Sequence, residues 1–220
     1  KRMIYFLDSL EKYHFINNAI CDRVGNEIEK LYADFCEKFS QSNDFQSVSK
    51  ELVDSLKKKL ASEEEFSSRF SDISYSKEAL PLIYYIFDRI SNDGLNPGQR
   101  ISIFNPDKRV SRKNFNIEHF YPVKPEDKKK NDDEVLEVDN IGNLLPISFR
   151  TNSKLGNLDP GEKMKKLLKD LDKEIQGQPC ILLDFINEYK NLAPSWSKRL
   201  IDERANKMAK KAYHNVWKIK

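Results

Sequence analysis

The chain has 220 residues, of which 39% are hydrophobic and 11% aromatic, and its 38 Lys and Arg residues nearly balance 35 Asp and Glu residues. This composition excludes an intrinsically disordered chain, which would have few aromatic residues and a large charge imbalance. The longest apolar stretch, residues 79–87, is much shorter than the roughly 20 residues that cross a bilayer. No membrane association is therefore expected.

The start of the chain and its cysteines indicate a compartment. No basic and apolar leader opens the sequence, and Cys21, Cys36 and Cys180 are odd in number and lack the close spacing of a thiolate metal site. We therefore predict a cytoplasmic protein in a reducing environment. Because the first residue is Lys1 and the sequence begins like the interior of a helix, we expect a fragment of a longer protein.

The first half of the chain has helical periodicity. Apolar residues recur at steps of three and four in residues 20–39 and again in residues 45–60, the spacing that places side chains on one helical face. Residues 80–90 are apolar nearly all round, which is typical of a helix buried on most sides. This half shows no Gly-rich phosphate loop and no cluster of His and Cys, and we interpret residues 1–100 as a helical scaffold.

Turn-forming residues mark a boundary after this half, at residues 92–94, 96–98 and 105–106. The residues that follow predict in turn a strand, an exposed charged loop, a second strand and one or two helical turns, at 115–121, 124–134, 141–149 and 150–158. Helical periodicity then returns in residues 163–175, 181–189 and 201–216. We therefore assign residues 101–220 to a small module with its core at 114–158, followed by C-terminal helices.

A carboxylate and an imidazole, Glu118 and His119, are adjacent at the end of the first predicted strand. Pro122 prevents the strand from continuing. Because adjacent strand residues point to opposite faces, the two side chains can share a site only at a strand terminus. Several carboxamides follow, among them Asn143 and Asn152, which a strand, turn and helix could fold towards this pair.

These ordered pieces resemble the HNH nucleases of the ββα-metal (His-Me finger) class, and more narrowly the C-terminal domain of GmrSD-type modification-dependent restriction enzymes and related phage-defence proteins. The resemblance is carried by Glu118-His119 with Pro122, by residues 141–144, and by Asn152, nine positions after Asn143. It implies a mainly α protein in which a helical scaffold encloses a small ββα-metal nuclease module. It further implies an endonuclease or nickase that acts on phage or modified foreign DNA, with a nucleotide-binding domain N-terminal to it or in a partner subunit.

Carried over residue by residue, the resemblance implies two catalytic residues and two metal ligands. His119 matches the general base, for which an imidazole suits because it changes charge near neutral pH. Asn143 matches the residue that fixes the orientation of that His. Glu118 and Asn152 match the ligands of a single Mg²⁺ or Mn²⁺, because carboxylate and carboxamide oxygens are hard donors. Many relatives have Asp or His where this chain has Glu118.

The cationic surplus lies in the second half of the chain, where residues 111–220 carry 22 basic and 17 acidic side chains. Arg204 is one of eight basic residues in the final stretch, 195–220. Such a surplus is a possible electrostatic footprint for DNA. The candidate phosphate contacts are Arg150, Lys154, Lys207, Lys210 and Lys211. A solvated helix face is the alternative explanation.

Structural alternatives exist for every candidate. His119 could be a structural histidine and Glu118 an exposed strand residue, while Asn143 could form a turn and Asn152 an N-cap. Two further carboxamides, Asn140 and Asn157, compete for the same roles, and Asp139 is an alternative metal ligand. The module as a whole could be a non-catalytic nucleic-acid-binding or interaction domain with a weakened site, or it could act as an RNase or toxin.

Overall fold

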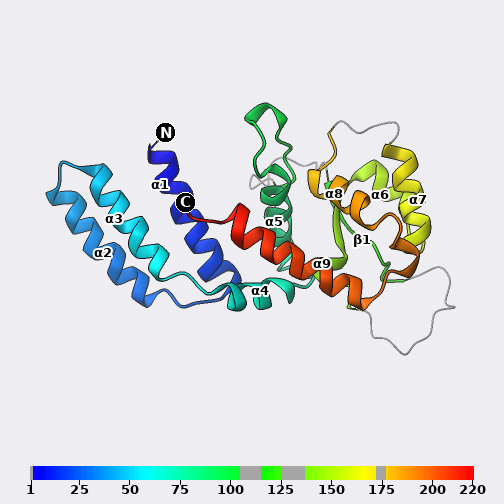
Figure 1. Cartoon of the computed structure of the whole chain (residues 1–220), viewed down its shortest axis with the longest axis horizontal. Coiled ribbons are helices and arrows are strands. Elements are labelled where there is room, and N and C mark those ends of the chain that lie inside the picture. The colour runs from blue at the N-terminus through cyan, green and yellow to red at the C-terminus, as the bar shows by residue number, and fades with distance from the viewer. Residues whose placement is uncertain (1, 105–114, 125–136, 172–176) are drawn as a thin grey trace. The chain divides into compact units, whose positions relative to one another are not determined.

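The computed structural model of the chain describes residues 2–104, 115–124, 137–171 and 177–220, and these are mainly helical (Figure 1). They form two compact units, one of Lys1–Phe70 with Ala209–Lys220 and the other of Ser71–Met208. The predicted division near residue 100 therefore lies within the second unit. The prediction of a mainly α protein is confirmed.

The first unit is built from helices that pack around one core. Helices α1 (Arg2–His14), α2 (Asn26–Gln41) and α3 (Phe45–Lys58) lie side by side, and α3 contacts both of the others (Figure 1). Helix α3 begins where Asp44 Oδ1 accepts a hydrogen bond from the Ser47 amide at 3.0 Å. The helical period then buries its apolar face against neighbouring helices, in a core that includes Tyr13, Ile28, Phe35, Leu52 and Leu56.

The predicted helix over residues 20–39 is wrong at its start. Ile20 ends a separate π-helical segment, Phe15–Ile20, and α2 begins only at Asn26. Asp22 has a φ of 52°, in the left-handed region that a right-handed helix cannot contain. Val24 is consequently 85% exposed, although its spacing placed it on the apolar face.

In the first unit, the segment that follows α1 and the C-terminal segment of the chain pack together through aromatic rings. Phe15 stacks on Trp217 with ring centroids 3.8 Å apart, and the Tyr213 hydroxyl donates to the Ala61 carbonyl at 2.8 Å. Trp217 directly follows a second π-helical segment, Ala212–Val216, and is fully buried. Stacked aromatic rings bury large apolar areas, so these contacts stabilise the first unit.

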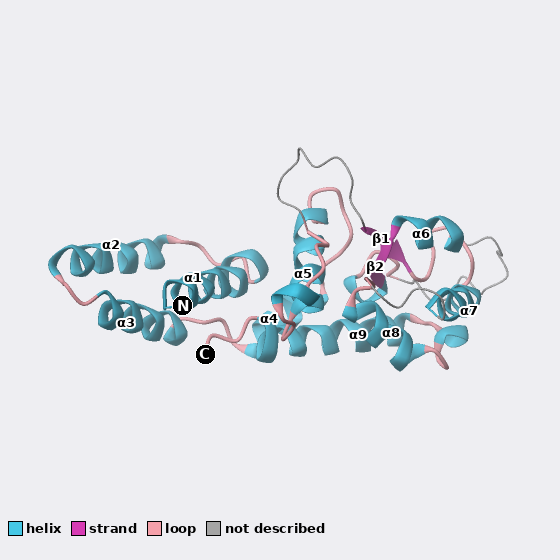
Figure 2. Ribbon diagram, turned by 90° about the horizontal axis from the view of Figure 1, so that it is seen from above, coloured by secondary structure: helices cyan, strands magenta, loops and turns pink. Residues whose placement is uncertain are grey.

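The second unit contains the two strands found in the described part of the chain, β1 (Phe115–His119) and β2 (Leu144–Ser148) (Figure 2). They pair antiparallel, with Glu118 opposite Leu145 and His119 opposite Leu144. The second strand starts three residues later than predicted, because Ile141–Asn143 form a 3-10 turn. Asn140 caps that turn by accepting a hydrogen bond from the Gly142 amide at 2.8 Å.

The helices of the second unit follow the order predicted from periodicity. They are α5 (Leu80–Asn92), α6 (Phe149–Leu155), α7 (Pro160–Leu171), α8 (Cys180–Tyr189) and most of α9 (Lys198–Lys211). A further helix, α4 (Glu63–Ser71), lies in the first unit except for its last residue. Both α6 and α8 contact β2, and the shared core includes Phe120, Leu145, Ile147, Phe185 and Trp196. Within α5, Ile83, Ile86 and Phe87 are fully buried, as predicted for that helix.

Some predictions fall on residues that are not described. Residues 125–134 of the predicted charged loop lie outside the described residues, as does the predicted turn at 105–106. Among the helices that are described, none combines the length and apolar character needed to cross a membrane. The enclosure of a ββα-metal module stays a prediction.

Candidate active site around His119

Glu118 and His119 lie at the terminus of β1, as the sequence predicts. The next residue, Phe120, donates its amide to the Asn143 carbonyl at 2.9 Å, and its fully buried ring packs edge-on against Phe185 and Trp196 with centroids 4.8 Å and 5.1 Å away. A large aromatic residue in the core thus anchors the chain directly after His119. A backbone hydrogen bond and side-chain packing therefore both fix the end of the strand.

The His119 imidazole is held by two contacts. Its Nε2 lies 2.9 Å from Asp139 Oδ1, and its ring meets the Tyr75 ring at 64° with centroids 4.8 Å apart. The His119 side chain is 16% exposed, so water reaches it. Within the described residues, no hydrogen bond to Nδ1 is found. The ring is therefore oriented, and one of its nitrogens remains available.

Glu118 forms a buried ion pair with Lys163 of α7. Lys163 Nζ lies 2.5 Å from Glu118 Oε1, and the two side chains are only 1% and 12% exposed. Burial raises the pKa of Glu118 and lowers the pKa of Lys163, while the attraction between the two charges opposes both shifts. Lys163 Nζ also donates to the His119 carbonyl at 2.7 Å. One ammonium group therefore binds both residues of the strand terminus.

Asn143 is fully buried, and its carboxamide bonds mostly to the backbone of the segments next to His119 and Asp139. Its Oδ1 accepts from the Tyr121 amide at 2.8 Å and from the Trp196 indole at 3.1 Å. Its Nδ2 donates to the carbonyls of Tyr121 and Val138 at 2.9 Å and 2.7 Å. Asn143 thus joins the segment that follows His119 to the segment that precedes Asp139, and any influence on the imidazole passes through the main chain.

Asn152 lies on α6, which packs against both strands of the hairpin. The N-cap alternative for this residue is wrong, because Ser148 caps α6 through a 3.1 Å hydrogen bond from the Thr151 amide to its Oγ. Asn152 is half-buried, and its carboxamide has no hydrogen bond within the described residues. Its oxygen is free to act as a ligand.

The donor chemistry of these residues fits a hard divalent cation with few protein ligands. No group of three or more His, Cys, Asp or Glu side chains suited to a metal ion occurs in the described ranges. A site would therefore depend on Glu118 Oε2 and the Asn152 carboxamide oxygen, with water in the remaining positions. Mg²⁺ tolerates this arrangement because it usually keeps several of its waters.

Helix α9 packs directly on the turn that carries Asn143. A Cβ atom on Gly142 would lie 2.1 Å from the Ile201 carbonyl oxygen, so only glycine permits this approach. Arg204 Nη1 donates to the carbonyls of Gly142 and Leu144 at 2.6 Å and 2.9 Å. Arg204 is 4% exposed. It was counted with the basic tail, but it is a buried structural residue and is not available to DNA.

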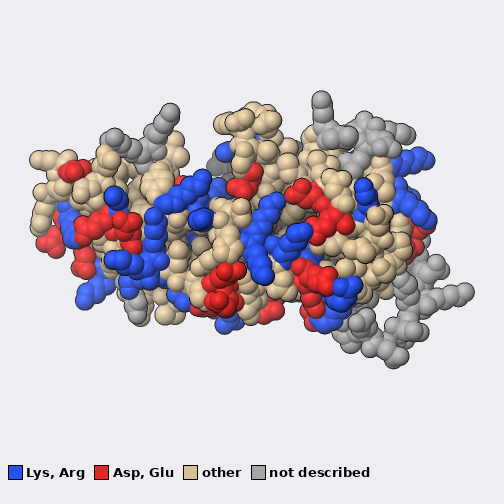
Figure 3. Space-filling model, in the orientation of Figure 1, with Lys and Arg blue, Asp and Glu red and all other residues tan. Residues whose placement is uncertain are grey.

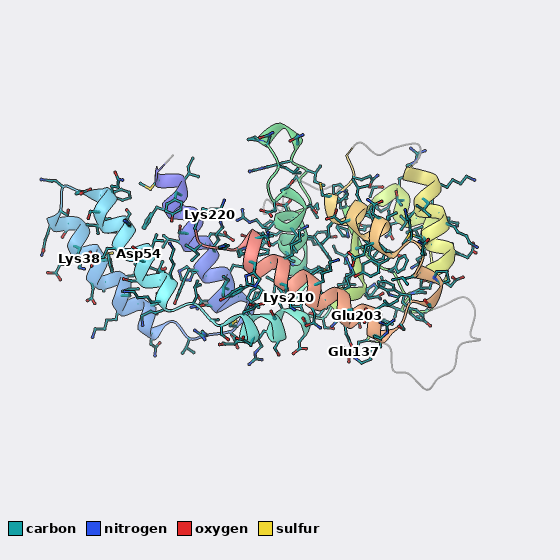
Figure 4. All side chains as sticks on the ribbon, viewed as in Figure 1. Lys38, Asp54, Glu137, Glu203, Lys210 and Lys220 are labelled. Atoms are coloured by element: carbon teal, nitrogen blue, oxygen red, sulfur yellow. The ribbon has the colours of Figure 1, made fainter. Side chains whose placement is uncertain are left out.

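The candidate phosphate contacts all lie on exposed helical positions. Arg150 and Lys154 are on α6, beside Asn152. In the tail, Lys207 pairs with Glu188 at 2.6 Å, and Lys210 lies near the C-terminal end of α9 (Figure 4). Lys210 and Lys211 belong to the first compact unit and Lys207 to the second. Figure 3 shows both basic and acidic side chains among the described residues of the face that it draws.

Sequence reasoning did not identify Lys163, and it considered Asp139 only as a substitute metal ligand. No sequence pattern marks Lys163 as functional, because it lies near the start of a predicted helix, where lysine is ordinarily solvated. Asp139 directly precedes Asn140 and the turn, where polar residues are common, and its side chain is 49% exposed. Only the fold brings both of them to the end of β1.

Comparison with known proteins identified a family. The family model described as the C-terminal domain of GmrSD restriction endonucleases matches residues 60–211. The matched region includes the hairpin, the 3-10 turn and helices α4 to α9. No curated protein and no solved structure matches the chain.

Proposed function

The chain belongs to the family of C-terminal domains of GmrSD restriction endonucleases, and on that basis we propose that it is a metal-dependent nuclease that hydrolyses phosphodiester bonds in DNA. The proposal includes an HNH-type site in which β1, β2 and α6 form the ββα module. The observation that carries it is the position of His119, an oriented and partly exposed imidazole at the end of β1, whose Nδ1 has no hydrogen bond from the described residues.

In the proposed reaction His119 acts as the general base. It takes a proton from a water molecule, whose oxygen attacks the phosphorus atom while the bond to the 3′ oxygen breaks. Asn143 keeps the two segments around His119 in place, and this lowers the reorganisation needed for proton transfer. Arg150 and Lys154 are proposed to contact backbone phosphates, which would position the strand without reading its sequence.

Glu118 Oε2 and Asn152 would hold the Mg²⁺ or Mn²⁺. When bound, such an ion neutralises charge that develops on the phosphate and on the leaving oxygen. Lys163 already occupies Glu118 Oε1, so the carboxylate would offer a single oxygen. The Lys163 contact also keeps that carboxylate in one orientation.

We further propose that this activity restricts phage DNA or modified foreign DNA in the cytoplasm. We also propose that a nucleotide-binding part, located N-terminal to these residues or in a partner subunit, selects the DNA.

A second candidate function is a non-catalytic nucleic-acid-binding domain, and the Glu118–Lys163 ion pair favours it, because Lys163 takes a carboxylate oxygen that an ion could bind. Incubation of supercoiled plasmid with Mn²⁺ or Mg²⁺ separates the two functions. A nuclease converts the plasmid to open-circular or linear forms, and chelator or His119→Ala abolishes the conversion. His214→Ala serves as the matched control, because His214 is exposed and pairs with Glu63 in the first unit. DNA binding in a mobility shift without any conversion would support the non-catalytic domain.

A further inference from the structure

Among the described residues, Asp139 is the charged side chain that lies within hydrogen-bond distance of the His119 imidazole. A carboxylate accepts hydrogen bonds and cannot donate them, so the 2.9 Å contact between Asp139 Oδ1 and His119 Nε2 requires a proton on Nε2. In a neutral imidazole the other nitrogen then carries the lone pair. The nitrogen that remains basic is Nδ1, which has no hydrogen bond within the described residues.

The main chain of Asp139 is anchored on both sides. Its carbonyl accepts a hydrogen bond from the Tyr75 amide at 2.7 Å, and the preceding carbonyl, of Val138, accepts from Asn143 Nδ2 at 2.7 Å. On the other side, Asn140 Nδ2 donates to the Ser71 carbonyl at 2.7 Å. Tyr75 also contacts the His119 ring. The acceptor is therefore fixed by the same segments that hold the imidazole.

We propose that Asp139 is a positioning residue that selects the tautomer of His119 with the proton on Nε2, so that Nδ1 is the atom that accepts the proton from water. This inference rests on the proposed nuclease function. As Nδ1 gains the proton, the electron pair of the water O–H bond becomes the new P–O bond, and the P–O bond to the 3′ oxygen breaks with its electron pair. The resulting imidazolium has a proton on each nitrogen, and the Asp139 carboxylate stabilises its charge.

The tautomer is measurable without metal or DNA. Protein labelled with ¹⁵N in its imidazoles gives nitrogen and proton correlations that distinguish the two neutral tautomers, recorded at a pH where the rings are neutral. His119 signals are assigned by their loss in His119→Ala. His14 is an internal reference of opposite kind, because its Nδ1 lies 2.7 Å from Asn18 Oδ1 and its Nε2 lies 2.7 Å from the Tyr32 hydroxyl. We expect the Nε2–H form at His119 and the Nδ1–H form at His14.

Two substitutions then test the role of Asp139. Asp139→Asn keeps the shape but offers a donor as well as an acceptor, so it no longer requires a proton on Nε2, and Asp139→Ala leaves Nε2 to solvent. We expect both to populate the Nδ1–H form and to lower the single-turnover cleavage rate by roughly 10²-fold or more, within the range that base catalysis contributes. Glu137→Gln is the matched control, since Glu137 lies two residues away, beside the start of α9, and pairs with Lys198 at 2.7 Å (Figure 4).

Each outcome bears on one claim. An Nδ1–H tautomer in the parent protein, or an unchanged cleavage rate in Asp139→Asn, overturns the role of Asp139 while the nuclease proposal stands. Full cleavage by His119→Ala overturns the proposed function instead. If neither parent nor variants cleave DNA, the catalytic part of the inference fails together with the nuclease.

Discussion

Removal of the Lys163 ammonium should destabilise the second unit more than any other single lysine substitution on α7. Lys163→Met keeps a long, flexible side chain but deletes the group that binds Glu118 Oε1 at 2.5 Å and the His119 carbonyl at 2.7 Å. Both side chains are largely buried, at 1% and 12% exposure. Breaking a buried pair by removing one partner leaves an uncompensated charge and costs about 3–5 kcal/mol.

The size of this loss should depend on pH in a defined direction. Burial already raises the pKa of Glu118, and without the Lys163 attraction that pKa rises further. A carboxyl group with a folded-state pKa above its unfolded value stabilises the folded state below the unfolded pKa, and this contribution is lost as pH rises through the folded pKa. The penalty of Lys163→Met should therefore be largest near neutral pH and should shrink in acid.

The assay is urea unfolding of metal-free protein followed by circular dichroism, with free energies taken by linear extrapolation. The double variant Lys163→Met with Glu118→Gln removes both charges and should recover part of the lost unfolding free energy. The coupling energy between the two substitutions should therefore be opposite in sign to the cost of Lys163→Met alone. Lys165→Met is the control, because Lys165 is exposed on the same helix and pairs only with Glu162 in the described contacts. A Lys163→Met cost no larger than that of Lys165→Met, near neutral pH, would refute the reasoning.

Three further predictions follow from the packing and charges of the chain. Gly142→Ala should destabilise the second unit by about 3 kcal/mol in the same assay, because its Cβ meets the Ile201 backbone at 2.1 Å, whereas Gly98→Ala, with open space around it, should cost little. Asn152→Ala should raise the Mn²⁺ concentration needed for half-maximal nicking, with partial rescue at excess metal, and an unchanged requirement removes Asn152 from the ligands. The logarithm of DNA affinity should fall linearly with the logarithm of salt concentration, by about 0.9 per phosphate neutralised. Replacement of Lys207, Lys210 and Lys211 by Gln should make that slope shallower by up to about three such steps. An unchanged slope would mean that these three lysines form a solvated face.

Local patterns predicted most of the helices and the end of β1. Helical periodicity depends only on spacing along one element, so α3, α5 and α8 follow from the sequence within a few residues. The position of His119 at a strand terminus followed from Pro122. The helix predicted through residue 22 failed because a single residue, Asp22, takes a left-handed conformation that spacing does not reveal.

The environment of the candidate site depends on tertiary contacts that spacing cannot supply. Lys163 and Arg204 are long basic residues that sequence reasoning places in solvent, yet both are buried where carbonyl or carboxylate oxygens from distant segments accept their hydrogen bonds. Asn143 was expected to orient His119, and its carboxamide bonds to main-chain groups of Tyr121 and Val138 and to the Trp196 indole. Burial of a polar group is decided by its partners, and partners distant in sequence leave no local pattern.

The most direct test removes the His119 imidazole by substitution and then supplies free imidazole in solution. His119→Gly removes the imidazole, and free imidazole added to the buffer can enter the resulting space because the parent side chain is 16% exposed. We expect His119→Gly with Mn²⁺ to leave supercoiled plasmid intact, and we expect added imidazole to restore nicking with the same requirement for metal as the parent. Nicking by His119→Gly at the parent rate without imidazole would contradict the central claim that His119 is the general base.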